Sequence, residues 1–277
     1  MNENSTLFNI LLYFVLGIFL IFAIFPFLWM VTTALKSGGE VLTYPPKIFP
    51  SSFHWESFQK IWTDGNLMIY FFNSLKVASI ATVTTIIIAI LAAIGFSRYD
   101  LPGSESLKVL FLVSQLFPLV LLVTPYYNIM RILDILDTHL ALIIAYISFV
   151  LPFSVWMLTN YFNAIPRDME ESAMIDGTTK FGAIIRVTLP LATPGIVATT
   201  INAFILAWNE FIFAQTFIDS PSLRTLPIGL RAFMGQYQTD WNLLMAGAVI
   251  STIPVIALFM FLQRHVIAGL TSGGVKG

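Results

Sequence analysis

Six long apolar stretches, separated by polar segments, constrain the fold more than any other feature of this sequence. The stretches cover about residues 7–35, 70–96, 107–131, 138–162, 190–217 and 242–265. A helix rising 1.5 Å per residue needs about 20 apolar residues to cross the hydrocarbon core of a bilayer, and these stretches reach that length. Because a helix satisfies its own backbone hydrogen bonds, the sequence predicts an all-α membrane protein with six transmembrane helices.

The composition agrees with this prediction and argues against nucleic-acid binding and cysteine-based chemistry. Of the 277 residues, 57% are hydrophobic and 10% are charged, which is unlike the balance in soluble domains. The net charge of −1 offers no basic surface that would attract nucleic acid. The absence of cysteine excludes disulfides, thiolate chemistry and most structural zinc sites.

An even number of spans places both termini on one side of the membrane. Basic residues divide almost evenly between the two sides, so charge alone favours cytoplasmic termini only weakly. The first stretch is too long for the core of a signal peptide, and we expect it to remain as an anchor. We therefore divide the chain into a first helix with an extracytoplasmic loop (1–69), a five-helix core (70–267) and a C-terminal tail (268–277).

A polar loop within the core, at about 163–189, is predicted to form two short helices. Pro166 suits the first turn of a helix, and acidic residues follow it as the positive end of a helix favours. Gly177 can adopt the left-handed conformation that ends a helix. A second amphipathic helix is expected over 178–189. From these properties alone, the loop is more simply an amphipathic connector on the membrane surface.

The spacing of residues within this loop points to something more specific. Glu171-Ser172-Ala173 is followed after three residues by Gly177, and after nine more by Val187-x-Leu189-Pro190. This pattern resembles the Glu-Ala-Ala loop of permease subunits in binding-protein-dependent ABC importers. Ser172 stands in place of the family's first alanine and Val187 in place of isoleucine, which are small changes in shape.

Further segments extend the resemblance over nearly the whole chain, to the smaller permease of maltose-type carbohydrate importers. They are Asp137-Thr138, Leu151-Pro152-Phe153, Ile165-Pro166, Ala207 to Phe211, Leu226 to Gly229, and the tail Gly269 to Gly277. The resemblance implies the type I ABC importer permease fold, with a coupling helix that docks on a cytoplasmic ATPase. It also implies a multi-pass location in a bacterial or archaeal cytoplasmic membrane, with both termini cytoplasmic.

The resemblance also implies partners and site residues. The partners are a second homologous permease, two ABC ATPases that hold ATP and Mg, an extracytoplasmic sugar-binding protein, and a carbohydrate, which is an oligosaccharide by this analogy. Glu171 would pair with a basic residue of the ATPase, and the tail residues Gly273, Gly274, Val275 and Lys276 would reach between the two ATPases. The ATPase-coupling residues are Glu170, Glu171, Ser172, Ala173, Asp176, Gly177, Phe181, Leu189 and Pro190.

The sequence offers no catalytic site, metal site or cofactor site on this chain. A phosphate-binding loop needs the motif Gly-x4-Gly-Lys-Ser/Thr. The pair Lys36-Ser37 could end such a motif, but Leu35 occupies the position where the second glycine is needed. The histidines, His54, His139 and His265, lie apart without a His-Glu-x-x-His pattern. We therefore expect a protein that is not an enzyme.

Glu210 is the clearest acidic residue within a predicted span. A charge there costs roughly 2.5–3.5 kcal/mol on insertion scales, so it should face the bundle interior or a wet cavity. A hydrogen-bonded interhelical contact with Asn209 or with a partner subunit is favoured over direct sugar contact. The candidate substrate-pathway residues are Tyr127, Asn128, Trp208, Asn209, Glu210 and Phe211.

Other functions stay open on the sequence. They are an importer of the same fold for another small solute, an ATP-independent carrier or channel, and a membrane enzyme. A carrier or enzyme would need several convergent ionisable groups within the spans, whereas Glu210 is nearly alone. The loop Asp219–Trp241 is expected either to meet the binding protein or to form a plain surface turn.

Overall fold

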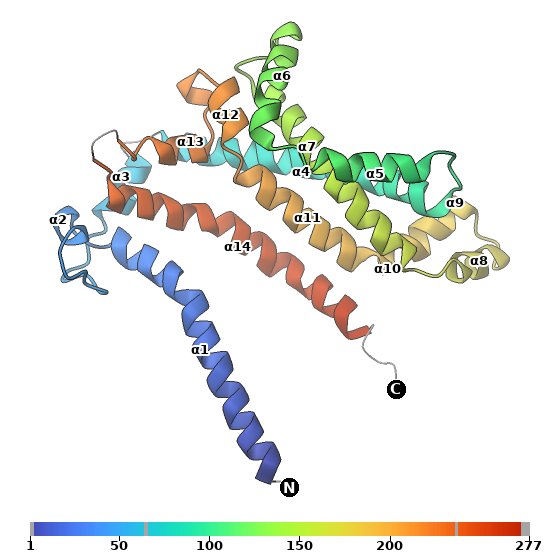
Figure 1. Ribbon diagram of the computed structural model, residues 1–277, viewed down its shortest axis with the longest axis horizontal. Helices are drawn as coiled ribbons and strands as arrows, with labels where there is room; N and C mark the ends of the chain where they lie inside the picture. The colour runs from blue at the N-terminus through green and yellow to red at the C-terminus, as the bar shows by residue number, and fades with distance from the viewer. Residues whose placement is uncertain (1–2, 64–65, 236–237, 273–277) are drawn as a thin grey trace. The chain divides into compact units, whose positions relative to one another are not determined.

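A computed structural model describes residues 3–63, 66–235 and 238–272, and within these ranges it contains helices and no β-strand (Figure 1). The helices are α1 Glu3–Ala34, α2 Gly38–Val41, α3 Glu56–Thr63, α4 Leu67–Arg98, α5 Ser104–Ser114, α6 Leu119–Ile132, α7 His139–Asn163, α8 Asp168–Ile175, α9 Lys180–Ala183, the π-helix η1 Ile184–Thr188, α10 Leu189–Leu191, α11 Thr193–Trp208, α12 Ile212–Phe217, the 3₁₀-helix η2 Pro221–Leu223, α13 Leu226–Arg231 and α14 Trp241–Ser272. The fold is therefore all-α, as the sequence predicts.

Four helical segments are long and apolar enough to cross a membrane by themselves. They are Phe8–Ala34, Leu67–Arg98, His139–Asn163 and Trp241–Arg264. Two further spans arise if each of two bent helix pairs is counted as one, which gives up to six. The predicted number of spans is reached only when both bent pairs are included.

The third predicted span, 107–131, is broken rather than continuous. Helices α5 and α6 meet at a bend of 103°. Pro118 lies immediately before α6, where its ring disfavours helical backbone at the preceding residue and its missing N–H removes a helical hydrogen bond. The bend is therefore encoded by the proline within an otherwise continuous apolar stretch.

The fifth predicted span, 190–217, is also interrupted. The stretch begins in α10, and α10 meets α11 at a bend of 69°. Helix α11 then ends at Trp208. Pro194 in the first turn of α11 cannot donate the hydrogen bond that would continue α10. A new short helix, α12, begins at Ile212, so the predicted stretch 190–217 is not one continuous helix.

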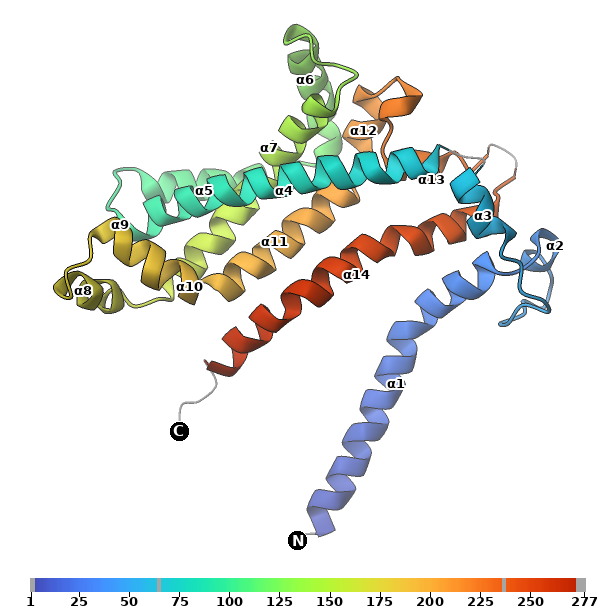
Figure 2. The same ribbon diagram turned by 180° about the vertical axis from the view of Figure 1, so that it is seen from behind.

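The chain forms two compact units. Unit 1 comprises Met1–Met68 and Gly229–Thr252, and unit 2 comprises Ile69–Ile228 and Ile253–Gly277. In unit 2, α4, α7 and α11 run side by side, with α8 and α9 near one end and α6 and α12 toward the other (Figures 1 and 2). This arrangement places the polar loop at one end of the helices that form the core of unit 2.

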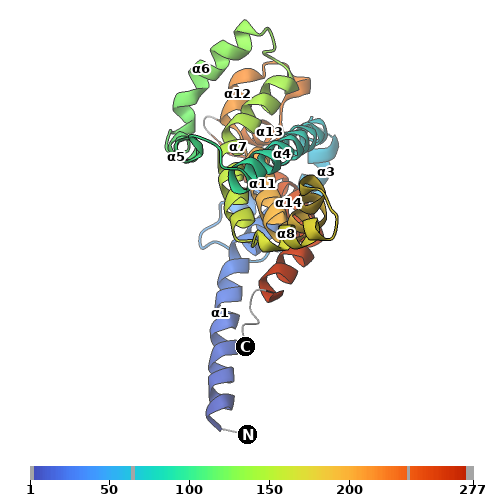
Figure 3. The same cartoon turned by 90° about the vertical axis from the view of Figure 1, so that its right-hand side faces the viewer.

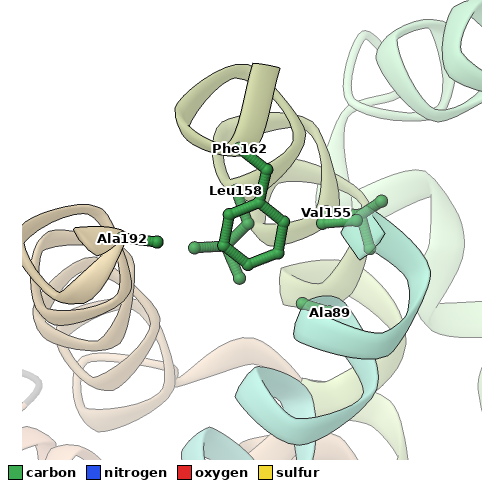
Figure 4. Close-up of a cluster of buried hydrophobic side chains, with 6 residues drawn as sticks. Ala89, Val155, Leu158, Phe162 and Ala192 are labelled. Atoms are coloured by element: carbon green, nitrogen blue, oxygen red, sulfur yellow. The ribbon is translucent and has the colours of Figure 1, made fainter. Parts of the chain in front are cut away.

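Small residues allow the helices of unit 2 to approach closely. The buried cluster drawn in Figure 4 consists of Ala89, Ala93, Val155, Leu158, Phe162 and Ala192. A β-carbon placed on Gly195 of α11 would lie 2.3 Å from Cγ of Tyr161 on α7. Close contact between α7 and α11 therefore depends on the missing side chain of Gly195, as is common where helices pack in membranes.

In unit 1, polar contacts fix the end of α1 to the start of α14. The Asn242 side-chain amide donates to the Thr33 carbonyl at 3.4 Å and also to the Lys36 carbonyl. The Lys36 ammonium lies 4.4 Å from the centre of the Trp29 ring and donates to the Lys47 carbonyl at 2.6 Å. By contrast, the most apolar window of α1 has no buried residue within the chain.

Candidate functional site

The polar loop between α7 and α11 folds into α8, α9, η1 and α10, which lie together at one end of unit 2 (Figures 1 and 3). The expected first helix is α8, and it begins at Asp168, just beyond Pro166. The expected single helix over 178–189 is instead three helical pieces, because η1 widens to a π-helix. Pro190 cannot donate to the carbonyl four residues before it, which favours this local change of hydrogen bonding.

Gly177 ends α8 in the left-handed conformation that the sequence predicts, with φ of +90°. Its N–H donates to the Met174 carbonyl at 3.1 Å, and the Thr178 N–H donates to the Ala173 carbonyl at 3.1 Å. These two bonds form a Schellman motif, in which glycine is preferred because a β-carbon disfavours this backbone. A β-carbon on Gly177 would meet no atom within 4 Å, so the constraint is on backbone conformation and not on space.

Glu170 points into the protein and fixes α8 to two other elements. Its Oε1 accepts from Arg98 Nε of α4 at 2.5 Å and also from the Thr188 hydroxyl of η1. Arg98 Nη2 also donates to the Ile165 carbonyl at 3.2 Å. The exposed fractions of the Arg98 and Glu170 side chains are 3% and 6%. This carboxylate is therefore held within the chain and is not offered to a second protein.

Glu171, the next residue, is exposed. Among the described residues, its side chain has no hydrogen-bond or ion-pair partner. The two adjacent acidic residues, which the sequence assigned together to ATPase coupling, thus occupy opposite environments. The resemblance to the family loop singled out Glu171, but nothing in the sequence indicated that Glu170 is buried, because the partners of Glu170 lie 72 and 18 residues away.

The outer surface of the loop carries exposed apolar side chains. Ile175 is 86% exposed and Phe181 is 71% exposed, and Met169 and Ile185 are also exposed. Several exposed apolar groups on one polar loop are typical of an interaction surface. Of the other predicted coupling residues, Ser172, Asp176 and Pro190 are exposed, and Ala173 and Leu189 are half-buried.

The predicted substrate-pathway residues occupy different environments. Trp208 is buried and stacks on Phe204, with 5.7 Å between ring centres. The side-chain amide of Asn209 is exposed and donates to the Ile205 carbonyl at 3.0 Å. Phe211 is half-buried, whereas Tyr127 and Asn128, on α6, are exposed. Their predicted contact with substrate stays a prediction.

Glu210 accepts hydrogen bonds from the start of α12. Its Oε1 accepts from the Phe213 N–H at 2.8 Å, and its Oε2 accepts from the Ala214 N–H at 3.1 Å. These N–H groups have no partner within the helix, so the carboxylate satisfies them where water is excluded. The carboxylate thus caps α12, whereas the Asn209 amide, its expected partner, donates to the Ile205 carbonyl instead.

Asp137 fixes the extended segment that follows α12. Its Oδ1 accepts from the N–H groups of Asp219 at 3.0 Å and Ser220 at 2.9 Å, and its Oδ2 accepts from the Ser220 hydroxyl. The hydrogen bond from the Ser220 side chain, and then those from the backbone, hold the pKa of Asp137 below its usual value. The sequence assigned no role to this residue, because its partners lie 82 and 83 residues away.

A polar cavity of about 320 Å³ lies beside the bend between α5 and α6. Its lining includes Ser114, Gln115, Tyr126 and Ser148. Gln115 Nε2 also donates to the Phe149 carbonyl at 3.2 Å. The sequence did not single out these residues, because the predicted continuous span 107–131 contains no bend at which a cavity would form.

Comparison with known proteins gives the family. Residues 85–272 match the family described as the binding-protein-dependent transport system inner membrane component. The sulfoquinovosyl glycerol transport system permease protein SmoH of Agrobacterium fabrum is 38% identical over 94% of this chain and 92% of its own length. The trehalose/maltose transport system permease protein MalG of Thermococcus litoralis is 34% identical over 93% of each chain.

A solved structure has the same fold. A chain of a bacterial ABC transporter involved in the import of the acidic polysaccharide alginate matches 95% of this chain and 98% of its own, with a TM-score of 0.76 and 21% identity. The chain described here therefore belongs to the family of binding-protein-dependent transport system inner membrane components.

Proposed function

We propose that this chain is one of two permease subunits of an ATP-driven importer that carries a carbohydrate into the cytoplasm by alternating access. The observation that carries the proposal is the surface of α8 and α9. It exposes the apolar side chains of Ile175 and Phe181, while Glu170 attaches the same loop to α4. Relatives whose names specify sulfoquinovosyl glycerol and trehalose/maltose support a carbohydrate as the substrate.

The coupling step follows from how the loop is attached. Two cytoplasmic ATPases, which hold ATP and Mg, close on one another and displace the α8–α9 surface. The pair of Arg98 and Glu170 transfers this displacement to the end of α4, because a buried ion pair resists separation. Packed helices then move as rigid bodies and reorient the cavity between the two permeases. Glu171, exposed beside this surface, pairs with a basic residue of the ATPase.

The remaining parts of the proposal concern topology and partners. Both termini lie in the cytoplasm of a bacterium or archaeon, which places the α8–α9 surface inside and the segment after α12 outside. The outer segment, fixed by Asp137, meets an extracytoplasmic sugar-binding protein. The tail residues Gly273, Gly274, Val275 and Lys276 lie outside the described residues, and their contact with the ATPases stays a prediction.

Affinity purification of the chain, expressed with its genomic neighbours, tests this function. Wild type should retain a Walker-motif ATPase, and Phe181→Glu should lose it, because a charge would be placed in an apolar contact. Phe49→Glu is the matched control, since Phe49 is 74% exposed in the loop between α2 and α3 and should not affect retention. Absence of an ATPase from the wild-type sample would favour an ATP-independent carrier or channel.

The substrate class needs a separate measurement. Uptake of labelled trehalose, maltose and a sulfoquinovosyl glycerol by cells with and without the chain would identify a carbohydrate substrate. Uptake of none of these sugars, but of another small solute, would leave the importer in place and overturn the carbohydrate assignment.

A further inference from the structure

A second cavity, of about 270 Å³, lies between α5 and the last turns of α7 and has no part in the transport cycle proposed above. Helix α5 contributes Glu105, Lys108, Val109 and Leu112 among others to its lining. Helix α7 contributes Trp156, Asn160 and Asn163 from one face, since these residues are four and three positions apart.

The lining changes from polar to apolar in the same direction on both helices. On α5, the charged pair Glu105 and Lys108 lies in the first turns, and Leu112 lies one turn beyond it. On α7, the amides of Asn160 and Asn163 lie at the end of the helix, and Val155 lies deeper. The cavity therefore has a polar mouth and an apolar floor, as a bound amphiphile requires.

Polar groups at the mouth are free to bind a ligand. Among the described residues, the side-chain amides of Asn160 and Asn163 and the indole N–H of Trp156 have no hydrogen-bond partner. Amide and indole N–H groups are hydrogen-bond donors. Three side chains with such donors thus line a cavity to which Lys108 also contributes.

The charges of Glu105 and Lys108 follow a definite order along α5. The two side chains form an ion pair with 2.7 Å between Nζ and Oε1. The Lys108 side chain is 25% exposed and that of Glu105 is 84% exposed, so the positive charge lies deeper than the negative charge. In a phospholipid with an ethanolamine head group, the phosphate likewise lies next to the glycerol and the ammonium lies farther out.

We propose that this cavity binds the head group of a phospholipid that carries a phosphate and a primary ammonium, such as phosphatidylethanolamine. Lys108, Asn160 and Asn163 bind the phosphate, Glu105 accepts from the ammonium, and the first methylene groups of an acyl chain contact Leu112. The rest of the lipid stays in the bilayer. A sugar fits less well, because its hydroxyl groups surround the ring and would leave the apolar floor without a matching group.

Assignment of the lipid to the cytoplasmic leaflet rests on the topology proposed above. Since α7 leads directly from this cavity to α8, the lipid would contact the helix that positions the coupling surface. The binding itself is a property of α5 and α7 and does not depend on which solute the importer carries.

Lipid retention by the intact, detergent-purified complex, measured by native mass spectrometry, tests the proposal. After delipidation, phosphatidylethanolamine, phosphatidylcholine and phosphatidylglycerol are added back separately. We expect the ethanolamine lipid to be retained best, because only its ammonium can donate to Glu105 without adding negative charge. Lys108→Gln and Asn160→Leu should each weaken its retention at least about tenfold, since each removes a hydrogen bond to a charged phosphate.

Lys60→Gln is the matched control, because Lys60 lies on α3, is exposed and does not line the cavity. Leu112→Trp fills the floor and should also reduce retention. Equal retention of all three lipids, retention unchanged in Lys108→Gln, or displacement of the lipid by trehalose would each overturn the proposal. Because retention is measured on an assembled complex, these outcomes leave the transport function untouched.

Discussion

The guanidinium of Arg98 and the carboxylate of Glu170 form a buried ion pair, with 2.5 Å between Nε and Oε1, that joins the end of α4 to the start of α8. A transmembrane helix and the surface loop that follows another span are thereby linked directly. The link matters because α8 is only eight residues long, which is too short for a helix to be stable by itself in water.

Glu170→Gln and Glu171→Gln should have different effects, although the residues are adjacent. Glu170→Gln leaves Arg98 as a buried, unpaired charge, which costs about 3–5 kcal/mol where no rearrangement compensates. We expect a lower thermal unfolding temperature and a loss of assembled complex. Glu171→Gln should leave the unfolding temperature unchanged and weaken ATPase retention. Equal unfolding temperatures for the two variants would contradict the buried pair.

Gly177→Val should reduce both ATPase retention and solute uptake. A β-carbon disfavours the left-handed backbone by about 1–2 kcal/mol, so α8 and α9 would be redirected relative to one another. Gly39→Val is the control, since a β-carbon there also meets no atom within 4 Å but the backbone is not left-handed. Normal uptake by Gly177→Val would argue against a role for this turn.

Gly195→Ala should destabilise the packing of α7 on α11. The added β-carbon would lie 2.3 Å from Cγ of Tyr161, and overpacking of this kind costs roughly 1–3 kcal/mol. The measurement is thermal unfolding in detergent. Tyr161→Ala combined with Gly195→Ala should recover part of the loss, because the two sites are in contact. A double variant as unstable as the sum of the two singles would place the cause elsewhere.

The segment after α12 should resist acid until the pH falls below about 4. The pKa of Asp137 is lower in the folded protein than in the unfolded chain, chiefly because of the hydrogen bond from the Ser220 side chain. Its stabilising effect is therefore fully present above the unfolded pKa and is lost as the pH falls through the folded pKa. The protection of the Asp219 and Ser220 amides from hydrogen exchange, measured against the intrinsic exchange rate at each pH, should therefore fall in that range.

Asp137→Asn provides the comparison for the acid experiment. The variant keeps one acceptor oxygen but has no charge, so exchange should already be faster near neutral pH and should show no transition of its own in acid. A transition of the same size in both proteins would show that another group controls this segment.

The sequence predicts those features that depend on neighbouring residues. Apolar length predicts the helical membrane fold, and the glycine that follows an acidic helix predicts the turn at Gly177. The ion pair of Arg98 with Glu170 and the hydrogen bonds of Asp137 with Ser220 could not be predicted, because packing brings together residues 72 and 83 positions apart. The bends of the third and fifth spans were missed because hydropathy outweighs single prolines in a search for apolar stretches.

The most apolar window of α1 contains no residue that is buried within its own chain. As far as this chain is concerned, any apolar sequence of similar length would serve equally well between Phe8 and Ile24. Whatever restricts the choice of side chains there must therefore come from surrounding lipid or from another subunit. If these positions were replaced by random apolar residues, the substitutions that impair function would therefore identify the positions of α1 that contact lipid or another subunit.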